Sequence, residues 1–205
     1  MRRIIAVLAG LVVLVMLGIS LFFAMRPLAE DQFAECREST VAGGSAAIGG
    51  PFELTDNKGN RVTDADVIDG PTLVYFGYTY CPDVCPLDTY RNAEAVSILG
   101  ERGMSVKPVM ITIDPQRDTP EELDAFVGYL HEDMVGLTGS AEEIKAAILT
   151  YRVYAAKNGE GEDYLMDHST MTYLMAPEHG LLEFFRRDLE PEELADKVAC
   201  FVDHL

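Results

Sequence analysis

An apolar run rich in β-forming residues, TLVYFGY at 72–78, is followed by a helical pattern at 86–101 and a second β-rich run at 105–114. Strands separated by a helix usually pair in parallel, because a crossover of that length returns the chain to the end of the sheet at which the first strand began. Two further runs, 171–177 and 181–187, flank the turn PEHG and predict an antiparallel hairpin. The sequence therefore predicts an α/β fold with helices flanking one sheet.

The outer segments extend this core. Residues 51–63 are typical of a β-hairpin, because DNKGN at 56–60 supplies turn residues. Residues 140–167 predict an inserted helix and loop before the last two strands. The C-terminal stretch 191–205 predicts a helix with one apolar face made of Leu194, Val198, Phe201 and Leu205. This order predicts a thioredoxin-like fold with an N-terminal β-hairpin and an inserted helix and loop.

Capping residues and prolines set several boundaries. Thr119 can cap a helix in which Pro120 takes the first position, and Ser140 begins another helix with an S-x-x-E capping box. Pro108 lies in the second strand but has no N–H for a ladder hydrogen bond. It must therefore fall at an edge or a bulge.

The N-terminal residues are set apart by 4–25, which contain no charge. Twenty-two residues that rise about 1.5 Å each span about 33 Å, enough for the core of a bilayer. A cleavable signal peptide is the alternative, but its apolar region is usually about 7–15 residues long and ends in a small-residue site. We expect a transmembrane anchor at 1–26, a flexible tether at 27–47 and a folded domain at 48–205.

Charge restricts the location and the partners. Arg2 and Arg3 are expected to stay in the cytoplasm, which places the domain outside it. The simplest location is a bacterial inner membrane, crossed once, with the domain in the periplasm. Beyond Arg26, the chain has 13 basic and 34 acidic residues, a formal charge of -21, which repels nucleic acid and excludes it as a partner. Free thiols in such an oxidising compartment tend to pair unless they are kept reduced or bind metal.

Two cysteines follow the first central strand in YFGYTYCPDVCP, where clefts form in open α/β sheets. Pro86 is expected at the first position of the next helix, with Cys85 just before it. Cys81 and Cys85 would then both lie in the positive field of a helix N-terminus, which lowers a thiol pKa. Their C-x3-C spacing leaves three roles open: a structural disulfide, a redox dithiol, or two soft ligands for Cu(I) with zinc as the competitor.

A third soft ligand would favour metal. Structural zinc sites want four ligands, whereas two thiolates and one imidazole suit copper. Of the four histidines, His131 lies in a charged stretch, His179 in a turn and His204 at the chain end. His168 stands just before a predicted core strand, in a position that faces the cysteine loop in a thioredoxin-like fold. It is the candidate ligand, although a lone histidine is more often a surface or core residue.

Several neighbours are candidates for supporting roles. Asp167 precedes His168 and could orient its ring by a hydrogen bond. Asp83 lies inside the cysteine loop and could touch a partner or the metal. Met166 and Met171 are soft enough to bind Cu(I), but packing in the core is the simpler interpretation.

The same choice arises at the end of the second strand. Asp114, Arg117 and Asp118 are further candidates, but the simpler interpretation is that Arg117 pairs with an acid and Asp118 starts a helix. Packing is also the simplest role for the nearby tyrosines Tyr75, Tyr78 and Tyr80.

Three segments in this order, YFGYTYCPDVCP, ITIDPQRDTPEEL and DHSTMTYLMAPEHG, resemble the signature of the Sco/SenC family of copper-binding assembly factors. The resemblance covers roughly residues 45–203. It implies a thioredoxin fold and copper bound by Cys81, Cys85 and His168, as Cu(I) or, because imidazole is a harder ligand, as Cu(II). It also implies delivery of copper to the copper A site of cytochrome c oxidase subunit II, or reduction of its cysteines, with a periplasmic copper donor or thiol reductant as a partner.

Three functions stay open. A copper chaperone would hold Cu(I) and pass it on by ligand exchange. A thiol:disulfide reductase, which is an enzyme, would attack a partner disulfide with one cysteine and resolve it with the other. A redox sensor would use the same pair without obligatory metal. A peroxidase is disfavoured, because such proteins resemble T-x2-C and Tyr78 occupies that position.

Cys36 and Cys200 fall outside the signature. At 100° per residue, Cys200 lies about 130° from the centre of the apolar face of its helix, which argues against a buried packing role. A Cys36–Cys200 disulfide would tie the tether to the last helix. Closing so long a loop stabilises a fold by up to about 5 kcal/mol.

Overall fold

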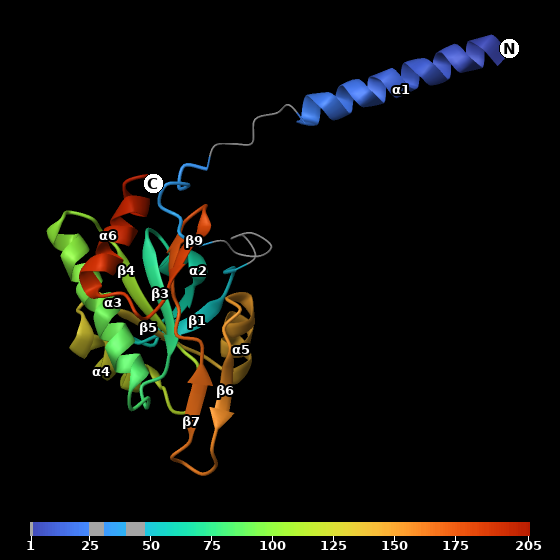
Figure 1. The fold of residues 1–205 in the computed structure, drawn as a ribbon. Coiled ribbons are helices and arrows are strands. Elements are labelled where there is room, and N and C mark those ends of the chain that lie inside the picture. Colours follow the sequence, from blue (N-terminus) through green and yellow to red (C-terminus); the bar gives the residue numbers. More distant parts are fainter. Residues whose placement is uncertain (1, 25–30, 40–47) are drawn as a thin grey trace. The chain divides into compact units, whose positions relative to one another are not determined.

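Figure 1 shows the computed structural model of the chain, which describes residues 2–24, 31–39 and 48–205. It divides into two units, Met1–Ala34 and Glu35–Leu205. Much of the predicted tether, 27–30 and 40–47, lies outside the described residues. The second unit contains the sheet and its core.

The helix near the start of the chain is α1, Arg2–Ala24. Among the described residues, no helix combines the length and the apolar character needed to cross a membrane. The anchor over residues 1–26 stays a prediction.

The second unit is built on a seven-stranded sheet in the order β2-β1-β5-β4-β3-β8-β9. The central strands β3, β4 and β5 run parallel, whereas β1 is antiparallel to β5 and β8 is antiparallel to β3. The hairpins β1–β2 and β8–β9 therefore close the two sides of a parallel centre. The strands are β1 (Glu53–Asp56), β2 (Arg61–Thr63), β3 (Thr72–Gly77), β4 (Lys107–Thr112), β5 (Val135–Thr138), β8 (Thr172–Ala176) and β9 (Gly180–Phe185).

Helices cover both faces of this sheet (Figure 1). On one face α3 contacts α4 and α6, and a core cluster joins Ala93 of α3, Met110 of β4 and Val127 of α4. On the other face Tyr151, which follows α5, packs against Phe76 of β3. This is the predicted layered α/β arrangement. The helices are α2 (Asp64–Val67), α3 (Val84–Glu101), α4 (Pro120–Leu130), α5 (Ala141–Thr150) and α6 (Pro191–Val202).

Pro108 shows how the parallel centre accommodates a residue without an N–H. It is the second residue of β4, an interior strand, and it pairs with Leu73 of β3. The N–H of Lys107 donates to Pro71 on the β3 side, so Pro108 faces the β5 side by alternation. The register with β5 begins only at Val109. The expectation of an edge strand or a bulge is wrong: Pro108 lies in an interior strand, and its missing N–H is tolerated because the pairing with β5 starts one residue later.

The region predicted as an inserted helix and loop contains more structure than expected. After α5, strands β6 (Ala155–Asn158) and β7 (Leu165–His168) form a separate antiparallel sheet. Both are short, and most of their side chains are exposed or half-buried, so neither leaves a clear apolar pattern. The sequence analysis also missed strand β5, because this strand is equally short.

Two helix boundaries also differ from the prediction. α3 begins at Val84, so Cys85 is helical and Pro86 is the third helical residue. A proline in the first turn loses no hydrogen bond, because N–H groups there have no intrahelical acceptor. Near the C-terminus of the chain, α6 ends at Val202. Leu205 lies beyond the helix and is exposed, so it is not part of the apolar face.

Leu54 tests whether the N-terminal hairpin belongs to the main core, because its side chain is fully buried there. We expect Leu54→Ala to lower the free energy of unfolding by about 2–5 kcal/mol, through lost apolar contacts and a cavity. The matched control Leu149→Ala, on α5 with 66% of its surface exposed, should change it by less than about 0.5 kcal/mol. Urea denaturation of both variants measures the difference, and equal small effects would contradict a shared core.

Candidate metal centre

The candidate centre lies where β3, α3 and β7 converge. Cys81 is in the loop after β3, Cys85 is in the first turn of α3, and His168 ends β7. Cys85 is fully buried and Cys81 is 8% exposed. The Sγ atom of Cys85 lies 3.3 Å from Nε2 of His168, across 83 residues of sequence. The fold thus brings together the signature residues of the first and third segments.

The state of His168 follows from its second ring nitrogen. Nδ1 lies 2.8 Å from the carbonyl oxygen of Ser169, which can only accept, so Nδ1 carries the proton. Burial lowers the pKa of His168, which favours the neutral ring. The lone pair of Nε2 therefore points at Cys85, whose S–H is the donor in this contact. A neutral imidazole with a free Nε2 is the form that binds soft metal ions.

The two thiols differ in their ease of ionisation. Burial opposes ionisation of Cys81, but backbone N–H groups of Asp83, Cys85 and Val84 donate to its sulfur and hold its pKa below the ordinary value. One of these contacts, from Cys85 N, is 3.4 Å long. For Cys85 burial dominates and raises the pKa far above the ordinary value. The expectation that both pKa values fall is wrong for Cys85, because its side chain points into the core rather than along the helix N-terminus.

Gly77, the last residue of β3, is a site residue that the sequence analysis missed. A Cβ atom there would meet Sγ of Cys85 at 3.3 Å and the ring of Tyr75 at 2.7 Å. Only a glycine lets Cys85 and Tyr75 approach the strand this closely. A glycine inside an otherwise apolar strand run is a signal for such an approach.

Tyrosine rings enclose the histidine. Tyr75 and Tyr78 are buried, and both meet the His168 ring edge-on, with centroids 6.2 Å and 6.0 Å away. The hydroxyl of Tyr75 donates to Asp88, and the hydroxyl oxygen of Tyr78 accepts from the N–H of Met166. Both rings are therefore fixed at each end. Their packing role is as expected, while Tyr80 is half exposed beside the loop.

The orienting role predicted for Asp167 is not found, whereas a contact of Asp83 with a partner or the metal stays a prediction. Asp167 does not orient His168, because Nδ1 bonds to the Ser169 carbonyl and the Asp167 carboxylate accepts from Asn158. The two residues alternate along β7, so their side chains point to opposite faces. Asp83 is the N-cap residue of α3 but makes no side-chain capping bond. Its contribution is the backbone N–H directed at Cys81.

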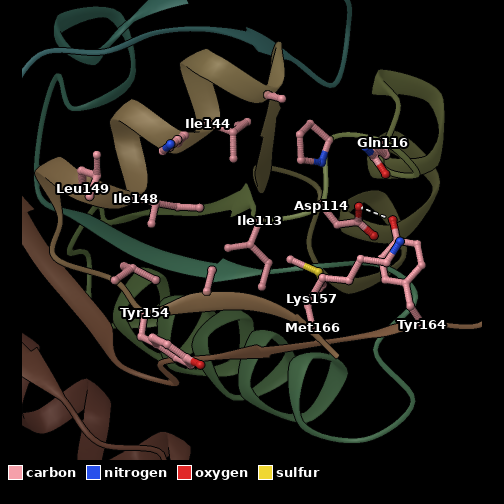
Figure 2. Close-up of a pocket in the computed structure, with 15 residues that line it drawn as sticks. Ile113, Asp114, Gln116, Ile144, Ile148, Leu149, Tyr154, Lys157, Tyr164 and Met166 are labelled. Carbon is pink, nitrogen blue, oxygen red and sulfur yellow. Dashed lines mark hydrogen bonds between the residues drawn. The ribbon is translucent and has the colours of Figure 1, made fainter. Parts of the chain in front are cut away.

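A polar cluster holds the cysteine loop from outside. Arg117 pairs with Asp114 at 2.5 Å and stacks on the Tyr164 ring at 3.7 Å. Asp114 also accepts a hydrogen bond from the Tyr164 hydroxyl, drawn as a dashed line in Figure 2. The expected pairing of Arg117 with an acid is present. Asp118 does more than start a helix: it is buried and accepts from both the N–H and the hydroxyl of Thr79. It thereby ties the loop after β3 to the end of β4.

Beside this cluster lies a mostly apolar pocket of about 450 Å³ (Figure 2). Ile113, Ile144 and Ile148 form its floor, and Met166 lines it from β7. Met166 and Met171 both pack against the main core cluster. Packing is therefore the observed role of these two methionines.

The three predicted ligands form an open arrangement. Among described residues, the group of metal-binding side chains with every ligand atom within 4.8 Å of the others is Cys36, Cys200 and His204. The ligand atoms of Cys81, Cys85 and His168 are therefore not all within this distance of one another. The side chain of Cys81 nevertheless interacts with that of Cys85, and its sulfur accepts from the backbone N–H groups of the α3 N-terminus. Two sulfurs and one imidazole nitrogen, all mostly buried, fit a soft monovalent ion.

Comparisons with known proteins identify similar proteins, two of which have solved structures with copper bound. The profile of the family described as SCO1/SenC matches residues 40–203. Protein SenC of Rhodobacter capsulatus is 50% identical over 201 residues, which cover 98% of this chain and 90% of that protein. The structure of Arabidopsis thaliana ScoI with copper bound is 42% identical, with a TM-score of 0.72, and covers 76% of this chain and 98% of its own. Bradyrhizobium japonicum ScoI with copper bound is 40% identical, with a TM-score of 0.69 and coverages of 75% and 98%.

The unequal thiols predict unequal reactivity. In the reduced, metal-free protein at pH 7, we expect iodoacetamide to alkylate Cys81 at least about tenfold faster than Cys85, because each unit of pKa changes the thiolate fraction about tenfold. The rate at Cys81 should persist to lower pH than that of a free thiol, since its pKa is depressed. Peptide mass spectrometry at timed intervals measures both rates. Faster labelling of Cys85 would contradict this assignment of the thiols.

Proposed function

This chain belongs to the SCO1/SenC family, and from that membership we propose that it is a copper chaperone for cytochrome c oxidase. It binds one copper ion through Cys81, Cys85 and His168. It delivers the ion to the copper A site of subunit II, or reduces the cysteines there. Two similar proteins have solved structures with copper bound, which supports copper as the cargo.

One observation carries the proposal: Nε2 of the half-buried His168 lies 3.3 Å from Sγ of Cys85, while Nδ1 bonds to the Ser169 carbonyl, which leaves the lone pair on Nε2. A dithiol that only exchanges disulfides has no need of an imidazole lone pair aimed at one sulfur. In the chaperone, copper takes the place of the proton between these two atoms, and Cys85 releases that proton. Metal binding offsets the cost of ionising a buried thiol.

Cys81 is suited to the exchange step. It is the more accessible sulfur, and the backbone N–H groups around it stabilise a thiolate. An incoming thiolate from the acceptor reaches the copper ion from this side and replaces Cys81 first. Cys85, which is fully buried, and His168 hold the ion until the acceptor has bound it.

The setting proposed for this chemistry is the periplasmic side of a bacterial inner membrane. The uncharged run 4–25, with Arg2 and Arg3 before it, supports a single anchor with the domain outside the cytoplasm. A periplasmic donor supplies copper, or a thiol reductant keeps the cysteine pair reduced. A reduced pair is needed because only thiolates bind the ion.

A thiol:disulfide reductase is the second candidate, and the asymmetry of the cysteines favours it. Cys81 has the lowered pKa of an attacking thiol and is the less deeply buried of the two, while Cys85 fits the resolving role. Both activities can serve one acceptor, because its cysteines must be reduced before they accept copper.

Copper competition decides between these candidates. The reduced full-length protein, kept anaerobic, is titrated with Cu(I) against a chromogenic chelator. We expect one tightly bound Cu(I) per chain, and affinities lowered by at least about 10–100-fold in Cys81→Ser, Cys85→Ser and His168→Ala. The control His179→Ala, in the turn before β9, should bind as the wild type does.

Two outcomes would overturn the chaperone. Failure to compete for Cu(I) would contradict copper binding by this site. Full affinity in His168→Ala would contradict the role of His168 as a ligand. A measured turnover of small disulfides that depends on both cysteines but not on His168 would then support the reductase.

Gly77 provides a test that leaves all three ligands in place. We expect Gly77→Ala to weaken Cu(I) binding by about tenfold or more, because the added methyl group displaces Cys85 or Tyr75. The control Gly128→Ala, where nothing lies within 4 Å of the new methyl group, should bind normally. Competition titrations and thermal unfolding of both variants separate lost affinity from lost fold. Unchanged affinity in a folded Gly77→Ala protein would contradict the close approach.

A further inference from the structure

A second set of soft donors lies at the end of α6. Cys36 and Cys200 are joined in a disulfide with Cα atoms 5.7 Å apart, and Nδ1 of His204 lies 3.8 Å from Sγ of Cys36. All three ligand atoms lie within 4.8 Å of one another. Cys200 and His204 are four residues apart, at and just beyond the end of a helix, so both reach the same side. This is the donor set of the candidate copper centre, with its two sulfurs oxidised.

The segment that carries Cys36 is held by contacts that do not depend on the disulfide. Arg37 donates to the carbonyl of Leu182 at 2.6 Å. The N–H groups of Glu38 and Ser39 donate to one carboxylate oxygen of Glu183, at 3.1 Å and 3.3 Å.

Two further contacts strengthen this attachment. Glu183 is buried in β9 and also accepts from the hydroxyl of Ser39. Lys197 of α6 pairs with Glu38. Opening the S–S bond therefore leaves Cys36 beside α6, where it still faces Cys200 and His204.

We propose that Cys36, Cys200 and His204 form a second, redox-gated binding site for Cu(I), closed as the disulfide and opened by a dithiol. Two thiolates and one imidazole are a three-coordinate set that suits Cu(I). The three donors differ in exposure: Cys36 is buried, Cys200 is half-buried and His204 is exposed. An ion can therefore enter from solvent past the imidazole.

The opening step balances as a thiol–disulfide exchange. One thiolate of an external dithiol attacks the Cys36–Cys200 bond, and its second thiol resolves the mixed disulfide. The dithiol loses two electrons and two protons, and Cys36 and Cys200 gain them as thiols. Binding of Cu(I) then releases both protons. Coordination through Nδ1 of His204 also requires the proton to move to Nε2, because Nδ1 now bonds to the Cys200 carbonyl at 2.7 Å.

This site is separate from the candidate copper centre. Figure 1 shows the end of α6 and the strand β7, which carries His168, at opposite ends of the domain. The inference does not rest on the proposed function, because none of its residues belongs to the first centre. The two can therefore be tested independently in the same chain.

The test uses the full-length Cys81→Ser/Cys85→Ser protein, in which Cys36 and Cys200 are the remaining cysteines. One sample is reduced with a dithiol and desalted anaerobically, and another is kept oxidised. Both are titrated with Cu(I) against a chromogenic chelator. We expect one Cu(I) per chain in the reduced sample and none in the oxidised one. Adding Cys200→Ser should abolish binding, and adding His204→Ala should weaken it by at least about tenfold.

Control variants separate a built site from general thiol binding. His179→Ala in the same background should bind as its parent does. Circular dichroism of the reduced parent checks that the fold survives reduction. No competitive binding by a folded, reduced parent would overturn the proposal, as would equal affinity with and without His204. Because the first centre is absent from this protein, neither result bears on the proposed chaperone activity.

Discussion

The contact between Cys85 Sγ and His168 Nε2 is the interaction around which the candidate centre is built. It exists because three separate features agree. Gly77 leaves room for the sulfur against β3, the Ser169 carbonyl holds the proton on Nδ1, and two tyrosine rings fix the plane of the imidazole. An imidazole nitrogen and a soft sulfur are thus aligned before any ion arrives, which reduces the ordering cost of binding.

The two cysteines occupy one short loop but meet different environments. Cys81 lies against the N–H groups that begin α3, whereas Cys85 turns inward and is desolvated. An outer thiol with a lowered pKa and a protonated inner thiol suit both proposed chemistries, ligand exchange and disulfide exchange. The second Cys–Cys–His group, beside α6, contains the same kinds of donor, but its two sulfurs are joined in a disulfide. The domain therefore presents this donor set in two oxidation states at two ends of the fold.

Much of the fold could be predicted from the sequence because its long elements carry strong local signals. The apolar strand β3, the hairpin β8–β9, and the capped starts of α4 and α5 all lie where the pattern places them. The missed strands, β5, β6 and β7, and the missed helix α2 are each four residues long. Strands this short depend on pairing with distant segments rather than on their own periodicity. The early start of α3 was missed because a proline in a first turn is tolerated without leaving a distinct pattern.

For the site, the sequence by itself determined which residues carry the chemistry: the C-x3-C pair after a buried strand and a histidine before another. The arrangement of those residues was decided by tertiary structure. Burial raised the pKa of Cys85, a backbone carbonyl rather than Asp167 oriented His168, and Gly77 admitted the sulfur. It also brought His204 beside Cys36, 168 residues away in the chain. Desolvation, ring orientation and close approach depend on what packs around a group, and a linear sequence does not contain that information locally.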